Sequence, residues 1–412
     1  MNPKAVSGAG AESAGAVPEI LLSTVAGSSR IRFAPNAGLP DLADPARTVA
    51  VTDGFVRRHL PSAYPADRIV EVPRGEAAKS LSSLESVYRR FLELGVGRDW
   101  TVLALGGGSV SDLAGFAAST WMRGVDFGFA PTTVLSMVDA AIGGKNGIDY
   151  GGYKNLVGSF RLPRFVLVDP AVLATLPARE AAAGLVEAVK HAVIEGPGHL
   201  DLLERAIPGR PTGADFRLPE DPALLAEILS RSIRLKARIV EEDFRESGVR
   251  RKLNLGHTVG HAVETVTGLP HGECVAAGLV FALGLATRRG GSGEGARRIL
   301  ELLGRLGVPR SLEEARLTAL SDAAAPPRPS GPAAPPEHAD GRSPVSASPA
   351  RAGDPGVLAD PAAFREAVAG ALRTDKKRSG GSVLFALPRA PGSVEIEPLE
   401  LAEIEDFVRE AP

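Results

Sequence analysis

The first half of the chain repeats one pattern, a short run of β-branched and apolar residues followed by a stretch with helical spacing. These runs lie at 48–52, 69–73, 101–105 and 165–169. Such alternation is typical of parallel strands joined by crossover helices, because parallel neighbours need a long connection. The pattern predicts an α/β domain with a nucleotide-binding type of sheet at 19–177, after a flexible tail at 1–18.

From about residue 178 onward, helical spacing dominates. Helices are expected at 178–195, 223–242, 258–267, 275–289 and 295–306, with no convincing strand before 382–387. This predicts a second, all-α domain at 178–412. A stretch rich in Pro, Ala, Ser and Gly interrupts it at 322–357. Such a composition has too few apolar residues to offset its ordering entropy, which predicts a disordered insertion, with a docking peptide as the alternative.

Composition narrows the classes of function. The formal net charge of -2 gives no electrostatic case for nucleic acid or an anionic membrane as partner. The single cysteine, Cys274, excludes an intrachain disulfide and a thiolate metal cage, and it is expected to be a small buried side chain. No apolar run suits a signal peptide or approaches the ~20 residues of a membrane span. These features predict a cytoplasmic enzyme.

Three of the 7 histidines lie close together in the sequence. His257 and His261 are four apart, so on a helix both project from one face and can share a cation or a substrate group. Gly268 and Pro270 should end that helix and turn the chain back, which would return His271 to the same place. The cluster favours a metal or catalytic centre over hydrogen-bonded core histidines.

A carboxylate on the helix expected at 178–195 is a second candidate for this centre. Glu187 and Lys190 lie three apart and share a helix face. An ion pair on a solvated face is the usual interpretation of this spacing. Their neighbours are mostly apolar, however, and a buried carboxylate needs a partner, of which a metal ion is one.

Glycine-rich and polar segments follow several of the predicted strands. Gly106-Gly107-Gly108-Ser109 opens a helix, where backbone N–H groups can approach a phosphate. The spacing differs from G-x-G-x-x-G, so a plain turn is the alternative. Asp53, Glu76 and Lys79 follow the first two strands, at the edge where open α/β sheets bind ligands. Solvated loop charges are the alternative for these three.

Lys145, Lys154 and Asn155 lie in glycine-rich segments that are expected to be loops. Such loops let ammonium and amide donors converge on an oxyanion, which suits a phosphorylated substrate. Flexible surface loops with ordinary lysines are the alternative.

In their order along the chain, these residues resemble the 3-dehydroquinate synthases. The shared signatures are the glycine-rich run at 106–116, Arg123-Gly124, Pro-Thr-Thr at 131–133, Asp139 through Lys145, Lys154-Asn155, Glu187-x-x-Lys190, the motif at 253–261 with Asn254, His257 and His261, and His-Gly-Glu at 271–273. Asp375-Lys376-Lys377 resembles the family's carboxyl-terminal lysine motif, and Asn146 replaces the family's usual Thr.

The resemblance implies a Rossmann-like NAD-binding domain and a helical domain that holds a zinc or cobalt ion, with the active site between them. It implies that the metal ligands are Glu187, His257 and His271, which moves His261 to the substrate shell. The implied NAD contacts are Asp53, Glu76, Lys79, Gly107, Gly108, Ser109, Asp112, Thr132, Thr133, Lys154 and Thr175.

The resemblance also implies the residues that bind and convert the substrate. The substrate contacts would be Arg123, Asp139, Lys145, Asn155, Lys236, Arg250, Asn254 and Lys376, and the catalytic residues Lys145, Lys190, Glu246 and His261. Lys377 is the alternative to Lys376, because the insertion precedes the motif. Arg123 would reach the neighbouring subunit's site, which implies a homodimer.

The implied reaction belongs to the shikimate pathway and converts 3-deoxy-D-arabino-heptulosonate 7-phosphate to 3-dehydroquinate and phosphate. It combines transient oxidation by NAD, elimination of phosphate, reduction and aldol closure. A sister sugar phosphate cyclase, of the amino-dehydroquinate or 2-epi-5-epi-valiolone synthase type, and a glycerol-dehydrogenase-like oxidoreductase are the alternatives. Arg250, with Lys236 upstream, favours a substrate that carries a carboxylate, because a guanidinium binds one through two parallel hydrogen bonds.

Overall fold

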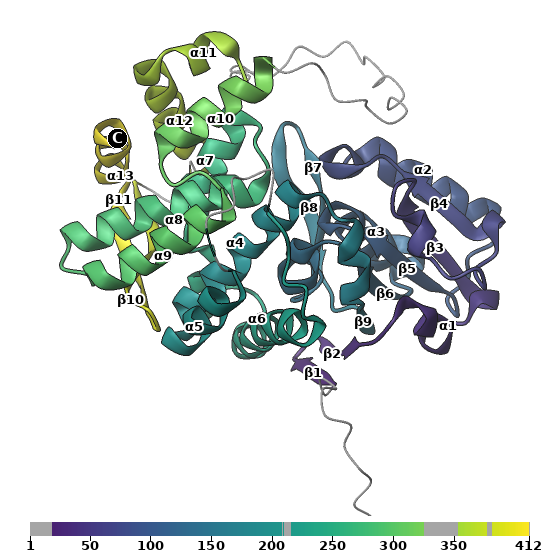
Figure 1. Cartoon of the computed structure of the whole chain (residues 1–412). Helices are drawn as coiled ribbons and strands as arrows, with labels where there is room; N and C mark the ends of the chain where they lie inside the picture. Colours follow the sequence, from purple (N-terminus) through teal and green to yellow (C-terminus); the bar gives the residue numbers. More distant parts are fainter. Residues whose placement is uncertain (1–18, 208, 210–215, 325–352, 377–380, 412) are drawn as a thin grey trace, which may run out of the picture.

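The computed structural model describes residues 19–207, 209, 216–324, 353–376 and 381–411, without side chains at 374–376. A half built around a sheet lies beside a mostly helical half, and the chain passes from the first to the second near α4 (Figure 1). The tail expected at 1–18 lies outside the described residues.

The sheet half is built on seven strands in the order β1-β2-β9-β6-β5-β3-β4. β1 and β2 form an antiparallel hairpin at one edge, which the sequence did not predict, and every other neighbouring pair is parallel. The strands are β1 Ile20–Thr24, β2 Gly27–Phe33, β3 Thr48–Asp53, β4 Ile69–Val72, β5 Thr101–Gly106, β6 Asp126–Pro131 and β9 Phe165–Val168. The four predicted runs therefore correspond to β3, β4, β5 and β9.

The central strands explain why this half folds as a parallel sheet. Every residue of β3 and β5 is buried, as expected where both faces of a parallel sheet are covered. Three helices accompany the sheet, α1 Leu39–Leu42, α2 Leu81–Glu93 and α3 Gly108–Thr120. The hydroxyl of Ser80 caps α2 by accepting a hydrogen bond from the amide of Ser83 at 3.1 Å. α3 follows β5 directly, which puts the amino terminus of α3 at the carboxyl edge of the sheet.

An antiparallel hairpin of β7, Lys145–Tyr150, and β8, Tyr153–Phe160, lies between the two halves (Figure 1). The expectation of loops at Lys145, Lys154 and Asn155 was therefore wrong. Gly151 and Gly152 form the turn with φ values of 60° and 83°, and positive φ at both turn positions is what a tight two-residue hairpin requires. The glycines thus serve a strand turn.

The second half contains ten helices within the described residues, and five of them match predicted ones. They are α4 Ala178–Glu195, α5 Pro197–Ala206, α6 Pro222–Glu242, α7 His257–Thr267, α8 His271–Arg288, α9 Gly293–Leu306, α10 Leu312–Ala324, α11 Pro355–Ala359, α12 Pro361–Lys376 and α13 Leu401–Glu410. The matches are α4, α6, α7, α8 and α9. In the part of the chain that the structure describes, no helix combines the length and apolar character needed to cross a bilayer.

This half is not all-α, because β10 Ser382–Ala390 pairs antiparallel with β11 Ser393–Glu400. β10 contains the strand expected at 382–387, whereas its partner was not predicted. The insertion expected at 322–357 is helical at both ends, since α10 runs to Ala324 and α11 begins at Pro355. Residues 325–352, on which the docking-peptide alternative falls, lie outside the described residues.

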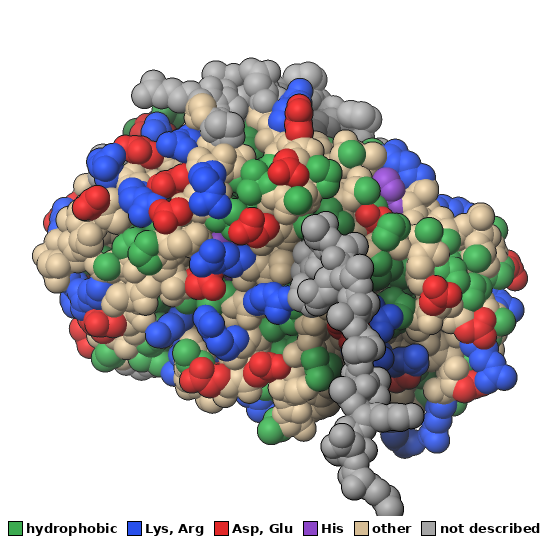
Figure 2. All heavy atoms as spheres, turned by 60° about the horizontal axis from the view of Figure 1, so that its bottom comes forward, with side chains coloured by type: hydrophobic (Ala, Val, Ile, Leu, Met, Phe, Trp, Pro, Cys, Tyr) green, Lys and Arg blue, Asp and Glu red, His purple; other side chains and the backbone are tan. Residues whose placement is uncertain are grey.

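The surface carries charges of both signs. Lys and Arg side chains are interspersed with Asp and Glu side chains over the face drawn in Figure 2. Many form ion pairs, such as Arg298 with Asp201 at 2.6 Å. This distribution agrees with the near-neutral net charge.

Candidate metal and dinucleotide site

Glu187 is deeply buried, because α4 is buried along most of its length. Its side chain is 0% exposed, and that of Lys190 is 1% exposed. The Lys190 ammonium forms an ion pair with Oε2 of Glu187. Within the described residues, neither carboxylate oxygen accepts a hydrogen bond of acceptable geometry. A buried carboxylate in this state can still accept a cation.

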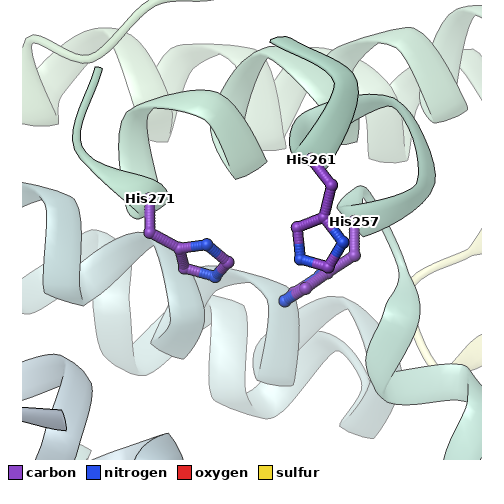
Figure 3. A group of neighbouring side chains, drawn as sticks. All are labelled: His257, His261 and His271. Atoms are coloured by element: carbon purple, nitrogen blue, oxygen red, sulfur yellow. The ribbon is translucent and has the colours of Figure 1, made fainter. Parts of the chain in front are cut away.

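The three histidines converge as the sequence predicted. α7 begins at His257 and ends at Thr267, Gly268 caps it with a left-handed φ of 70°, and α8 then begins at His271. The ring centroids lie 5.3 Å apart for His257 and His261, and 5.2 Å for His257 and His271. Figure 3 shows the three rings turned toward one another.

The carboxylate of Glu187, on α4, approaches two of these histidines. Its Oε1 lies 3.6 Å from Nε2 of His257 and 3.9 Å from Nε2 of His271. The other nitrogens are engaged elsewhere, because Nδ1 of His257 is 3.2 Å from the carbonyl of Leu255 and Nδ1 of His271 is 3.1 Å from Oε2 of Glu264. If both Nδ1 atoms donate, both Nε2 lone pairs face Glu187. Two imidazoles and a carboxylate arranged in this way fit a divalent cation.

The surroundings favour a neutral imidazole at His257 and orient the ring of His271. Burial, assisted by the charge of Lys190, holds the pKa of His257 well below its usual range. Burial alone would lower the pKa of His271, but Glu264 outweighs it and the pKa is raised. Burial would likewise raise the pKa of Glu264, but His271 and Lys154 lower it to about 2. Glu264 is therefore ionised at neutral pH and holds the ring of His271.

A second group of possible ligands shares Glu187. Asp139, Glu187 and His191 offer ligand atoms within 4.8 Å of one another. Lys236 donates to Oδ1 of Asp139 at 2.7 Å, so an ammonium group already compensates the carboxylate that distinguishes this group from the histidine group. This argues against a second divalent ion there. Sequence reasoning missed His191, although its position four residues after Glu187 on an apolar helix was the available signal.

Two expected substrate residues, Lys236 and Arg250, lie beside Asp139. Lys236 also donates to the backbone carbonyl of Asp139 at 2.6 Å. Burial lowers the pKa of Lys236 to about 8, although Asp139 opposes the shift. The guanidinium of Arg250, which is 3% exposed, donates to the carbonyls of Phe244 at 2.6 Å and Gly143 at 3.1 Å.

Lys145, Glu246 and Asn254 form a neighbouring group. Lys145 makes an ion pair with Oε2 of Glu246, and the Asn254 amide donates to Oε1 of Glu246 at 2.6 Å. Glu246 has a φ of 61°, which a residue with a side chain rarely adopts. Backbone strain of this kind is concentrated at functional sites.

Asp243 holds the loop that presents Glu246 and Arg250, and sequence reasoning missed it. Its buried carboxylate accepts hydrogen bonds from the amides of Ser247 at 2.9 Å, Gly248 at 2.6 Å and Arg250 at 3.1 Å. Burial would raise the pKa of Asp243, but these bonds lower it. The Ser-Gly pair that follows was the only sequence signal.

Several expected NAD contacts gather at the carboxyl edge of the sheet. Lys79 donates to Asp112 at 2.9 Å and to the side-chain oxygen of Asn155. The Ser109 hydroxyl donates to Glu76 at 3.2 Å. Asn155 was expected to contact the substrate, but its side-chain oxygen accepts from Lys79, which was expected to contact NAD.

The glycine-rich turn and the Thr-Thr pair lie next to each other. α3 begins at Gly108, and a methyl group added to Gly107 would lie 3.4 Å from Thr133. The Thr133 hydroxyl accepts from the amide of Ser136 at 3.1 Å, whereas the buried Thr132 hydroxyl has no hydrogen-bond partner within the described residues. Thr132 is therefore available to a ligand.

Asp53 ends β3 and Thr175 lies in the turn after β9, so both follow strands of the sheet. Asp53 Oδ1 accepts from the amides of Phe55 at 2.8 Å and Val56 at 3.1 Å, so one oxygen shapes the loop after β3. The Thr175 hydroxyl lies 3.1 Å from Nε2 of His59, another residue that the sequence did not single out.

Two further expected residues, Arg123 and Lys376, are not joined to the other site residues within the part of the chain that the structure describes. Arg123 lies in an exposed turn with a φ of 67°. The side chain of Lys376 and all of Lys377 lie outside the described residues.

Two family models and several known proteins match this chain. Residues 69–183 match the family model for the 3-dehydroquinate synthase N-terminal region, and 184–325 match the C-terminal one. The 3-dehydroquinate synthase of Pelobacter propionicus is 45% identical over 245 residues, which is 58% of this chain and 66% of that protein. That of Acaryochloris marina is 38% identical over 330 residues, 79% of this chain and 74% of that protein. The chain thus spans just under two thirds of the first relative.

Two solved structures have similar folds. One is 2-deoxy-scyllo-inosose synthase with carbaglucose-6-phosphate, NAD⁺ and Co²⁺, at 22% identity and a TM-score of 0.72, covering 96% of this chain and all (100%) of that one. The other is 2-epi-5-epi-valiolone synthase from Streptomyces hygroscopicus subsp. jinggangensis with NAD⁺ and Zn²⁺, at 25% identity and a TM-score of 0.71, covering 92% and 95%.

Proposed function

The chain belongs to the 3-dehydroquinate synthase family, and we propose that it converts 3-deoxy-D-arabino-heptulosonate 7-phosphate to 3-dehydroquinate and phosphate. The observation that carries the proposal is the approach of Glu187 to the Nε2 atoms of His257 and His271. The cationic side chains around Asp139 and Glu246 add the means to bind an acidic sugar phosphate.

The proposed site holds NAD and one divalent ion. Glu187, His257 and His271 would bind zinc or cobalt, since two imidazoles and a carboxylate accept either metal. When bound, NAD would accept and return a hydride, and the ion would polarise the oxygen on the same carbon. The solved relatives with NAD⁺ and Co²⁺ or Zn²⁺ support this pair of cofactors. Lys190 would orient the Glu187 carboxylate through its contact with Oε2.

Arg250 and Lys236 would bind the substrate carboxylate. A guanidinium carries five N–H donors, and two of those of Arg250 go to backbone carbonyls, so about three remain for a ligand. Those carbonyls also fix the plane of the guanidinium, which favours a paired contact with a carboxylate. Lys236, with a pKa of about 8, is mostly charged at neutral pH and adds to this contact.

Lys145 and the side-chain amide nitrogen of Asn155, whose oxygen is engaged by Lys79, would bind the phosphate, and Glu246 and His261 would exchange protons near it. Lys145 is half exposed and already aligned by Glu246, so its ammonium can turn toward an anion at little cost. The leaving phosphate is itself a base, which agrees with the lack of a dedicated general base among the sequence motifs. His261 is exposed beside His257 and His271, where it can exchange protons with solvent.

The proposal includes a homodimer in which Arg123 reaches the partner's site. Met122 and Arg123 have φ values of 50° and 67°, and both are exposed. The nearby strand β8 exposes apolar side chains, with Leu156 47% and Phe160 41% exposed. Apolar side chains grouped at a surface favour contact with another protein. A division at 19–177 and 178–412 into NAD-binding and metal-binding domains is part of the same proposal.

The direct test is a turnover assay. The protein, with Zn²⁺ or Co²⁺ and catalytic NAD⁺, should release phosphate from the heptulosonate phosphate and form 3-dehydroquinate without net NADH. Phosphate release from sedoheptulose 7-phosphate instead would assign a sister cyclase. Net NADH formation on a simple alcohol would assign a dehydrogenase.

Glu187→Ala tests the metal assignment within this proposal. The variant should lose turnover and bound metal together, because the deeply buried carboxylate is one of three expected ligands. Metal content is measured by elemental analysis of the purified protein. Full turnover in a metal-free Glu187→Ala protein would refute the assignment.

A further inference from the structure

Glu264 on α7 connects a residue of the sheet half to a residue of the helical half. Its Oε1 accepts from Nζ of Lys154, on β8, at 2.5 Å. Its Oε2 lies 3.1 Å from Nδ1 of His271, the first residue of α8. Lys154 and Glu264 are 110 positions apart in the chain, so only the fold brings them together.

The contact on the histidine side fixes which nitrogen of His271 faces Glu187. Because Oε2 of Glu264 lies 3.1 Å from Nδ1, that nitrogen is the donor to the carboxylate, and Nε2 is turned toward Glu187, 3.9 Å away. Carboxylates in this position orient histidine ligands and make them better donors to a metal. Glu264 is 8% exposed, so little water competes for its oxygens.

The contact on the lysine side is open to a second ligand. An ammonium group carries three donors, and one of them holds Glu264. The Lys154 side chain is 45% exposed, so it can contact a bound molecule while it keeps Glu264 in place. Lys79, the neighbouring lysine, is 5% exposed and directed to Asp112 instead. Of these two, Lys154 therefore has both the accessible ammonium and the connection to His271.

We propose that Glu264 is a positioning residue that couples the binding of the dinucleotide at Lys154 to the binding of the metal ion at His271. This inference rests on the proposed function for the identity of the two ligands. A dinucleotide that contacts Lys154 restricts its ammonium, and through Glu264 it restricts the ring of His271 before the metal binds. Coupling between two binding sites is reciprocal, so the metal must tighten dinucleotide binding by the same factor.

The test measures metal affinity without any turnover. The full-length protein, freed of metal by a chelator, is titrated with Co²⁺ against a chromophoric competitor, with and without saturating NAD⁺. We expect NAD⁺ to tighten Co²⁺ binding in the wild type by about 5-fold to 100-fold. Glu264→Gln should weaken Co²⁺ binding by about 10-fold to 100-fold and remove the effect of NAD⁺.

Lys154→Met separates positioning from folding. It keeps the aliphatic stem, and its own Co²⁺ affinity without NAD⁺ serves as the reference against which the effect of NAD⁺ should disappear. Lys154→Arg, which restores a cation, should recover part of it. A wild-type effect of NAD⁺ that persists in Lys154→Met would overturn the inference, even if Glu264→Gln failed to fold.

Ser109→Ala is the matched control on the dinucleotide side. Ser109 contacts Glu76 and not Glu264, so its loss should weaken NAD⁺ binding but leave the effect of saturating NAD⁺ on Co²⁺ affinity unchanged. A protein that makes 3-dehydroquinate but binds Co²⁺ equally well with and without NAD⁺ contradicts the coupling alone. A protein that binds neither ligand contradicts both the coupling and the proposed function.

Discussion

Four carboxylates of the candidate site each have one ammonium partner. Lys190 pairs with Glu187 and Lys236 with Asp139 in buried surroundings, whereas Lys145 pairs with Glu246 where the lysine is half exposed. The fourth pair is Lys154 with Glu264. Since breaking a buried pair leaves an uncompensated charge, the four lysines should differ in their effect on stability.

Lys190→Met should destabilise the metal-free protein by about 3–5 kcal/mol, because Glu187 would then be a buried charge without a partner. Addition of Zn²⁺ should recover much of this loss, since the ion would replace the ammonium. Lys145→Met is the control and should cost about 1 kcal/mol or less, because its lysine is half exposed. Urea unfolding with and without Zn²⁺ measures these differences, and equal losses for the two variants would contradict the argument.

Loss of the Lys236 charge should lower activity at alkaline pH. Burial lowers its pKa to about 8, so the side chain is charged below that pH and neutral above it. If the charge helps to bind the substrate carboxylate, kcat/KM should fall as pH rises through about 8. Lys236→Arg stays charged at alkaline pH and should shift this fall to higher pH. If kcat/KM of this variant falls at the same pH as that of the wild type, another group is responsible for the fall.

At the scale of elements, the ligand geometry depends on the close packing of α4 against α8. Gly272, next to His271, lies where a methyl group would be 2.0 Å from the carbonyl oxygen of Ala183 on α4. Because α4 carries Glu187, the separation of these two helices sets the distance between Glu187 and His271.

Gly272→Ala should therefore push α8 away from α4. We expect a loss of about 1–3 kcal/mol from overpacking, together with weaker metal binding. Gly284→Ala on the same helix is the control, because its added methyl group would lie 3.4 Å from the ring of Phe407, an ordinary contact. The control should keep its metal and retain or gain stability. Thermal unfolding and metal content measure both effects, and unchanged metal content in Gly272→Ala would contradict the packing argument.

Elements with a strong apolar period were predictable from sequence. The helix expected at 178–195 matches α4 residue for residue. Its sequence is mostly apolar, and Gly196 follows directly and ends it. The β7–β8 hairpin was taken for loops because its glycines resemble a flexible segment. β11 was missed because its alternation is short and is interrupted at Pro398, after which Leu399 is buried out of phase with Val394.

The candidate site was predictable where its residues share one helix or one turn. The meeting of His257, His261 and His271 follows from local spacing and a helix end. Spacing alone would pair His257 with His261, whereas the structure directs His257 and His271 toward Glu187. Glu264 was missed because its role depends on Lys154, a residue far away in the chain.

At the scale of the whole molecule, the proposed homodimer predicts that two inactive variants complement each other. In a mixture of Arg123→Ala and Glu187→Gln subunits, each mixed dimer would contain one site with its own ligands and the partner's Arg123. Random exchange should restore about a quarter of wild-type activity, because half the dimers are mixed and each has one intact site of two. Activity assays after co-refolding test this. No recovery, with mixed dimers present, would place Arg123 in its own subunit's site.

The left-handed backbone at Glu246 has an evolutionary consequence. Holding a side chain at a φ of 61° costs about 1–3 kcal/mol, which the rest of the fold must supply. Glycine would relieve that cost, but it would remove the carboxylate that meets Lys145 and Asn254. A library of variants selected only for heat resistance should therefore acquire glycine at position 246 and lose turnover. Selection for growth should retain glutamate despite its cost in stability.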